Sequence, residues 1–111
     1  MHINIKATGL DLTPSIETYI ETKLGTLARL VQKLDAEGQP ELHVEIARTT
    51  RHHRHGEVFR AEGNLRVPKK LLRAVEESDN VRKAIDMLKN TLRLELEKYK
   101  AKNLPGRRAR T

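Results

Sequence analysis

Residues 59–75 read FRAEGNLRVPKKLLRAV and contain the clearest structural pattern of the chain. The alternating apolar positions are Phe59, Ala61, Leu65 and Val67 before the proline, and Leu72 and Ala74 after it. A period of two is typical of β-strands that bury one face. Pro68-Lys69-Lys70 separates the two halves and marks a turn. We therefore predict two consecutive strands joined by this turn.

The preceding part of the chain predicts two more strands with a helix between them. The first strand contains Ile3 and Ile5 and ends near Thr8-Gly9, and the second contains Leu42, Val44 and Ile46. Thr13 and Pro14 fit the N-cap and the first position of the helix. Its apolar stripe comprises Ile16, Ile20, Leu24, Leu27, Val31 and Leu34. Steps of three and four over this length predict a helix of about five turns.

A second long helix is expected after the fourth strand. Ser78 or Asp79 can cap it, and its stripe comprises Val81, Ile85, Leu88, Leu92, Leu96 and Tyr99. Because each helix has a single apolar stripe, the predicted fold is α+β with the order βαβββα, a four-stranded sheet with two helices packed on one face. The other sheet face is expected to stay exposed to solvent. We expect residues 1–104 to form one domain and residues 105–111 a basic, flexible tail.

The charge balance favours a polyanionic partner. The 111 residues include 22 Lys and Arg against 15 Asp and Glu, a net charge of +7. Nucleic acid is therefore the first candidate and an anionic membrane the second. Aromatic residues make up only 3% of the chain, which argues against a surface that stacks single-stranded bases. No apolar run has transmembrane length and no secretory signal opens the chain, so we expect a cytoplasmic protein without a membrane partner.

We expect no enzymatic activity. The chain has no cysteine, which excludes disulfides, thiolate metal sites and cysteine nucleophiles. It also lacks a nucleophile motif and a glycine-rich phosphate loop. His52, His53 and His55 stand beside arginines on a predicted turn, without the fixed geometry of a zinc site. We therefore expect no catalytic residue, metal, cofactor or small-molecule substrate.

The second helix carries the strongest candidates for RNA binding. Arg82, Lys89, Arg93 and Lys100 recur at steps of seven, four and seven, and they are flanked by Lys83, Lys98 and Lys102. This spacing predicts a basic line on the side of the helix opposite the apolar stripe. The alternative is an ordinary solvated face with acidic residues interspersed. The net charge favours the functional interpretation.

A second candidate is the hairpin spanning residues 48–60, in which Arg51 and Arg54 stand among the histidines. The planar fork of arginine can hold a phosphate through two parallel hydrogen bonds. The alternative is a merely soluble surface loop. Lys69 and Lys70 form a weaker basic tip.

Several local motifs, taken in order, resemble the ribosome hibernation promoting factor family, also called ribosome-associated inhibitor A or sigma-54 modulation proteins. The N-terminal half contributes Ile3-Asn4-Ile5, Leu12-Thr13-Pro14, Tyr19, Lys23 and Leu24. The sheet contributes Phe59-Arg60-Ala61-Glu62, Asn64-Leu65-Arg66-Val67-Pro68 and Leu72-Arg73-Ala74. The second helix contributes Asp79, Ala84-Ile85-Asp86, Leu88, Leu92 and Lys98-Tyr99-Lys100. The chain departs from the family pattern at Arg82, Thr91 and Glu95.

The resemblance implies a ribosome hibernation factor that binds the small ribosomal subunit and its rRNA in the channel used by messenger RNA and tRNA. Such a factor inhibits translation and protects idle ribosomes. Of the basic residues, Lys23, Lys98 and Lys100 fit the family pattern best. Long members also carry a carboxy-terminal domain that pairs ribosomes, and we expect this chain to have no ribosome-dimerising domain of its own. A general double-stranded RNA module and a protein interaction adaptor that uses the exposed sheet face remain the alternatives.

Overall fold

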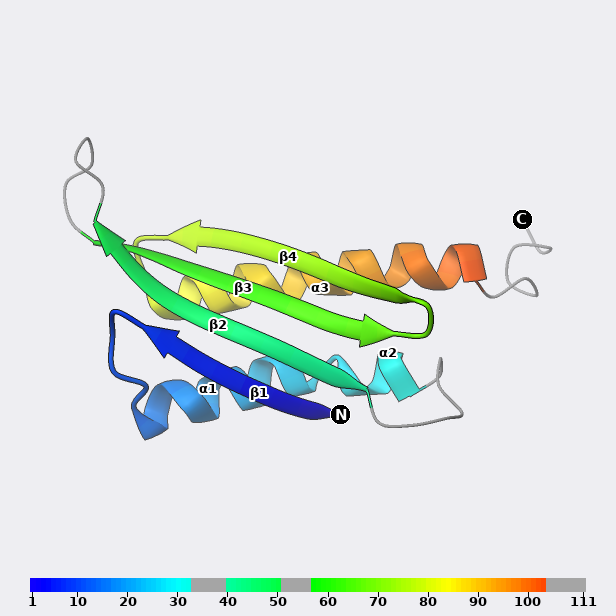
Figure 1. Cartoon of the computed structure of the whole chain (residues 1–111), viewed down its shortest axis with the longest axis horizontal. Coiled ribbons are helices and arrows are strands. Elements are labelled where there is room, and N and C mark those ends of the chain that lie inside the picture. Colours follow the sequence, from blue (N-terminus) through cyan, green and yellow to red (C-terminus); the bar gives the residue numbers. More distant parts are fainter. Residues whose placement is uncertain (33–39, 51–56, 104–111) are drawn as a thin grey trace.

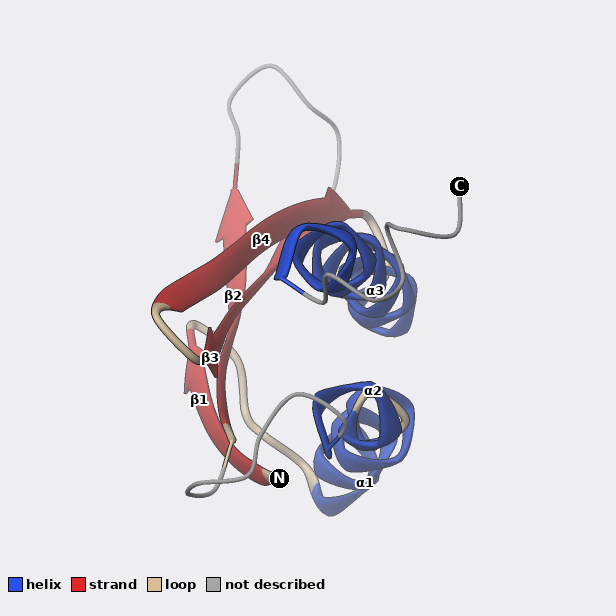
Figure 2. Cartoon of the chain, turned by 90° about the vertical axis from the view of Figure 1, so that its right-hand side faces the viewer, coloured by secondary structure: helices blue, strands red, loops and turns tan. Residues whose placement is uncertain are grey.

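A computed structural model of the chain describes residues 1–32, 40–50 and 57–103 (Figure 1). The elements are β1 (His2–Thr8), α1 (Pro14–Gly25), α2 (Ala28–Gln32), β2 (Glu41–Thr50), β3 (Glu57–Val67), β4 (Lys70–Ser78) and α3 (Val81–Asn103). The strands form one mixed sheet in the order β1-β2-β3-β4, with β1 and β2 parallel and the other pairs antiparallel. All three helices lie on the same side of the sheet (Figure 2). The predicted α+β fold is confirmed.

The core lies between the sheet and the helices, as the alternating strands and the helical stripes require. Its largest fully buried side chains are Ile20, Leu24, Leu27, Val31, Leu42, Ile46, Leu65, Ile85, Leu88, Leu92 and Leu96. Gly63 on β3 lets α3 approach the sheet closely, because a Cβ built there would lie 2.9 Å from Leu92 Cδ1 and 3.3 Å from Leu88 Cδ1. A larger residue at this position would overpack the interface.

The first helix is shorter than the sequence predicts. Thr13 accepts from the Ile16 amide and caps α1 as expected, but the helix ends at Gly25 and a separate short helix begins at Ala28. The Thr26 hydroxyl donates to the Lys23 carbonyl at 2.7 Å, and the Leu27 amide shifts to the Leu24 carbonyl at 3.0 Å. A side chain that competes for backbone acceptors next to a glycine interrupts the helix while the apolar stripe continues.

The cap of the long helix differs from the prediction by one residue. Neither Ser78 nor Asp79 caps α3. Asn80 does so, because its Oδ1 accepts from the backbone amides of Arg82 at 2.9 Å and Lys83 at 3.1 Å. Asparagine is as good an N-cap as serine or aspartate, so three adjacent cap residues left the choice open in the sequence.

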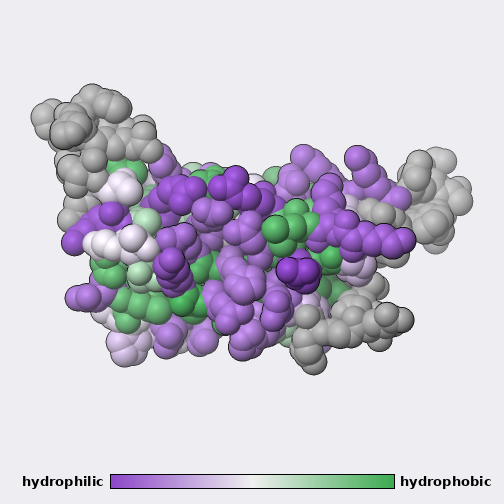
Figure 3. All heavy atoms as spheres, viewed as in Figure 1, coloured by the Kyte–Doolittle hydropathy of each residue, from purple (hydrophilic) through white to green (hydrophobic). Residues whose placement is uncertain are grey.

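The sheet face away from the helices is exposed and mainly hydrophilic (Figure 3). We call it the open sheet face. Its charged residues are Lys6, Arg60, Arg66 and Arg73 together with Glu41, Glu45, Glu62 and Glu77, so the two signs occur in equal number. Leu71 also lies here and is 53% exposed, whereas the adjacent Leu72 points into the core. The predicted tail, residues 105–111, lies outside the described residues, as does Leu34 at the end of the first predicted stripe.

Candidate nucleic-acid interface

The basic line of α3 lies on the flank of the helix that faces α1, and the prediction that it stands opposite the apolar stripe is wrong. Two contacts fix this orientation. Arg82 donates to Ser15 of α1, and on the other flank Thr91 donates to Glu76 of β4. A helix turns by about 100° per residue, which puts this line only about a quarter-turn from the centre of the buried stripe. The predicted cations thus border the contact between the two helices.

The residues of the predicted basic line differ in their exposure to solvent. Arg82 and Arg93 are exposed and Lys89 is half-buried, so these three side chains are available to a partner. Lys100 is only 6% exposed and is therefore not available to a partner in the same way. The spacing of Lys100 is right for the line, but spacing alone does not reveal how far the neighbouring segments cover a helix flank.

Five side chains of α1 and α3 form what we call the tyrosine cluster. Its members are Ser15, Tyr19 and Lys23 from α1 and Arg82 and Asp86 from α3. The Lys23 ammonium lies 5.5 Å and the Arg82 guanidinium 5.4 Å from the centre of the Tyr19 ring. Arg82 Nη2 donates to Ser15 Oγ at 2.7 Å, and Tyr19 donates its hydroxyl proton to Asp86 at 2.8 Å. Lys23 Nζ lies 3.7 Å from the Asp86 carboxylate.

The cluster holds two cations in place on one aromatic ring. The hydrogen bond to Asp86 raises the pKa of Tyr19, and burial and the Asp86 charge act in the same direction, while Arg82 lowers it. The phenol therefore remains a neutral donor and the ring a neutral platform for Lys23 and Arg82. Side chains that are already ordered lose less conformational entropy when they bind a ligand. The pair is suited to hold phosphate groups.

The remaining cations of α3 are more loosely engaged. Arg93 pairs with Glu97 at 3.1 Å and Lys98 with Glu95 at 3.4 Å, both on the helix surface. Exposed pairs of this kind contribute little stability, so a polyanion can displace the carboxylates. Lys83 and Lys102 are exposed as well. Arg51, Arg54 and the three histidines lie outside the described residues.

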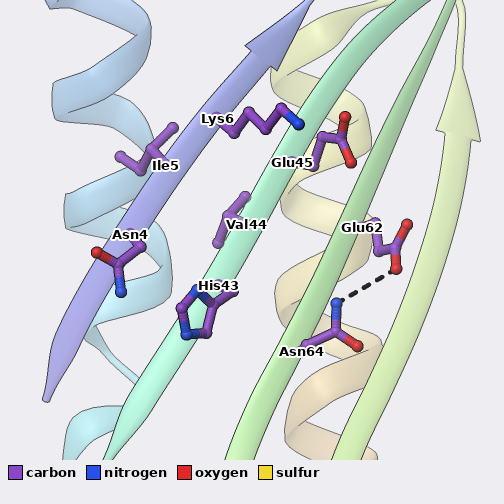
Figure 4. Close-up of a pocket in the computed structure, with 8 residues that line it drawn as sticks. All are labelled: Asn4, Ile5, Lys6, His43, Val44, Glu45, Glu62 and Asn64. Carbon is purple, nitrogen blue, oxygen red and sulfur yellow. Dashed lines mark hydrogen bonds between the residues drawn. The ribbon is translucent and has the colours of Figure 1, made fainter.

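The open sheet face has a different chemistry. A hollow of about 220 Å³ is lined by Asn4, Lys6, His43, Glu45, Glu62 and Asn64, among others (Figure 4). Hydrogen bonds from Arg73 and Asn64 lower the pKa of Glu62. Its carboxylate therefore stays charged, and it pairs with Arg60 at 3.0 Å and Arg73 at 2.9 Å. This face therefore presents no excess of cations over acids.

Residues 1–32, 40–50 and 57–103 contain no group of three or more His, Cys, Asp and Glu side chains placed to hold a metal ion. In the same ranges, no helix is both long and apolar enough to cross a membrane.

From the sequence, Lys23 and Arg82 were predicted to bind RNA, and Tyr19 and Asp86 were named only as part of the family resemblance, so the cluster itself was missed. A signal was present, because Ser15, Tyr19 and Lys23 are four residues apart on one helix and Arg82 and Asp86 four apart on the other. Such spacing aligns side chains on one face of a helix. What the sequence does not reveal is that these two faces meet.

Comparisons with known proteins agree with the resemblance. A family model described as "Sigma 54 modulation protein / S30EA ribosomal protein" matches residues 3–103. A ribosomal subunit interface protein from Coxiella burnetii has a similar structure, with a TM-score of 0.71 and 24% identity over 91% of this chain and 99% of that one. The N-terminal domain of Protein Y from Thermus thermophilus gives a TM-score of 0.66 and 25% identity over 89% of this chain and 99% of that one. No curated protein sequence matches this chain significantly.

Proposed function

Because the chain belongs to the Sigma 54 modulation protein / S30EA ribosomal protein family, we propose that it is a ribosome hibernation factor. It binds the small ribosomal subunit in the cytoplasm, in the channel used by messenger RNA and tRNA. By occupying that channel it inhibits translation and protects idle ribosomes.

The observation that carries this proposal is the tyrosine cluster and the cations that continue from it along α3. Lys23 and Arg82 are fixed on Tyr19, and Lys89 and Arg93 extend the same flank. Phosphate contacts position a protein on RNA without reading its sequence, and they need cations at fixed places on a rigid support. Two helices packed on a sheet provide that support.

The mechanism requires no chemical step. Folded rRNA is recognised by its shape and by its phosphates and 2′-hydroxyl groups. A rigid wedge with cations on its helical side can fill an RNA groove in this way and exclude other ligands from it. The family description names a ribosomal protein, which supports a ribosomal location for this chain.

Co-sedimentation of the purified protein with isolated small subunits and with vacant ribosomes tests the proposal. We expect stoichiometric binding that messenger RNA and initiator tRNA together displace. A plain RNA duplex in excess is the control, because it displaces a general double-stranded RNA module but leaves a channel-bound factor in place. Protein that stays at the top of the gradient at low salt would overturn the proposal.

A further inference from the structure

The turn between β3 and β4 has an unusual residue in a strained position. Pro68 and Lys69 connect the strands, and Lys69 has a φ of 65°. A turn with proline first and a positive φ second is of type II, in which glycine or asparagine is favoured at the second position. A lysine is disfavoured there by steric crowding of its Cβ. Among the described residues other than glycine, Lys69 alone has a positive φ.

The turn is anchored to the end of α3. The Tyr99 hydroxyl donates to the Pro68 carbonyl at 2.6 Å, and Tyr99 itself is only 8% exposed. The turn and the last turns of α3 lie at the same end of the molecule (Figure 1). The strained turn is therefore held in place by the long helix.

Beside this anchor is a second hollow, of about 460 Å³. It is lined by Lys70, Glu95, Lys98, Tyr99, Ala101 and Lys102. Three of these side chains are cations, and the single carboxylate, Glu95, is already paired with Lys98 at 3.4 Å. Lys69 is adjacent in the chain and exposed. We call Lys69, Lys70, Lys98 and Lys102 the basic corner.

We propose that the basic corner is a second phosphate-binding site, which holds the backbone of an RNA strand. It is separate from the tyrosine cluster, because Lys98 and Lys102 lie on the β4 side of α3, whereas Arg82 faces α1. The inference rests on the proposed function, since it assumes an RNA partner. It joins Lys69 and Lys70 of the β3–β4 turn with Lys98 and Lys102, which flank the basic line of α3, in one site.

Neutralisation of the helix dipole is the simplest alternative explanation. Lysines near a helix C-terminus interact favourably with the carbonyl end of the helix, and this accounts for Lys98 and Lys102. It does not account for Lys69 and Lys70, which are outside the helix, nor for a lysine at a turn position that favours glycine. Strained residues that persist in a structure tend to occur at functional sites.

The two sites together span α3. From Arg82 to Lys102 the helix rises about 30 Å, so one protein can contact phosphates that are many nucleotides apart or on different RNA strands. Such separated contacts fix an orientation that a single patch cannot. Two contact sites also make binding steeply dependent on salt.

A double variant, Lys69→Gly with Lys70→Gln, tests the proposal in the full chain. Glycine relieves the strain at position 69, so we expect a thermal midpoint no lower than that of the wild type. Affinity for isolated small subunits should fall about 10-fold at moderate salt, and the slope of log K against log salt should become shallower by nearly two. The variant should therefore bind more weakly without being less stable. A purely structural role of Lys69 and Lys70 predicts instead that affinity falls only when stability falls.

The matched control is Lys6→Gln with Arg60→Gln, which removes the same charge from the open sheet face at the far end of the strands. Its salt slope should equal that of the wild type. If Lys69→Gly with Lys70→Gln lowers the midpoint, Lys98→Gln with Lys102→Gln replaces it, with the same expected change in slope. If the variant of the basic corner keeps the wild-type affinity and salt slope, the basic corner is not a phosphate-binding site, and the proposed function still stands. Failure of the wild type to bind subunits would instead overturn the proposed function.

Discussion

The two outer surfaces of this protein carry many charges but arrange them differently. On the open sheet face, Arg60 stands opposite Glu77 and Arg66 opposite Glu41 in the strand register, so opposite charges pair across strands. On the helical face, two cations share one tyrosine ring in the tyrosine cluster. Cross-strand pairs of opposite charge stabilise a sheet and leave little field outside it. The difference shows that, among the described residues, the cations of the open sheet face are balanced by acids within that face.

The open sheet face also contains two neighbouring carboxylates whose repulsion is compensated by nearby side chains. Glu45 and Glu62 are direct partners in the register, and like charges in such positions are destabilising. Arg60 lies 3.0 Å and Arg73 2.9 Å from the Glu62 carboxylate, and Thr8 donates to Glu45 at 2.9 Å. The acids are therefore compensated within the face. A surface that satisfies its own charges has little to offer a polyanion.

The largest expected effect is on the free energy of unfolding, and it distinguishes the sheet face covered by helices from the open sheet face. Leu92→Ala removes a fully buried side chain that packs close to Gly63, and we expect it to lower the free energy of unfolding by about 3 kcal/mol. Leu71→Ala, on the open sheet face, should change it by less than about 0.5 kcal/mol. Urea denaturation of both variants measures the contrast. A large loss in the Leu71 variant would mean that the open face is covered.

The next effect is on ribosome binding. Replacing Arg82, Lys89 and Arg93 by Gln should weaken binding to small subunits on the order of 100-fold, since three phosphate contacts are lost. The control replaces Lys6, Arg66 and Arg73 by Gln and removes the same charge from the open sheet face. Titration at fixed salt compares them, with circular dichroism to verify folding. Equal losses in both variants would show that net charge matters and its location does not.

Helix α3 supports the whole helical face, so its cap is the third test. Asn80→Ala removes the acceptor for two backbone amides and should lower the free energy of unfolding by about 1 kcal/mol. Asn80→Asp keeps the acceptor and should be close to neutral. If the Ala variant is as stable as the wild type in thermal unfolding, Ser78 or Asp79 caps the helix in solution.

Sequence patterns predicted the sheet and the long helix because alternation and helical stripes follow directly from burial. They failed where one side chain decides a local competition. Thr26 interrupts the first helix by taking the Lys23 carbonyl, and nothing in the apolar spacing reveals it. Which of three cap residues begins α3 depends likewise on local geometry.

The candidate site was predicted as a set of residues but not as an arrangement. Lys23 and Arg82 were identified from charge and resemblance, yet their meeting on Tyr19 depends on how α1 packs beside α3. Lys100 has the right spacing and is nonetheless buried. Position along a helix follows from sequence, whereas the coverage of a flank follows from tertiary packing.

The two faces should also differ in their response to pH. On the open sheet face the pKa of Glu62 is lowered, chiefly by Arg73 and Asn64. The unfolded state then binds the proton more readily, so stability falls as the pH drops below the ordinary glutamate range. We expect a contribution of under about 1 kcal/mol, because the pairs are near the surface. Thermal midpoints of the wild type and Glu62→Gln should converge on acidification; parallel curves would contradict this.

On the helical face the effect is expected at the alkaline end. The pKa of Tyr19 is raised, mainly because its hydroxyl donates to Asp86. Above the ordinary tyrosine range the unfolded state loses this proton first, so folding is progressively weakened as the pH rises. Tyr19→Phe removes this dependence but keeps the ring under Lys23 and Arg82. The wild type should therefore lose its advantage over this variant only at high pH. If the stability difference between the wild type and Tyr19→Phe stays constant through the titration, the hydroxyl contributes by packing. The hydrogen bond to Asp86 would then not be what holds Lys23 and Arg82 in place.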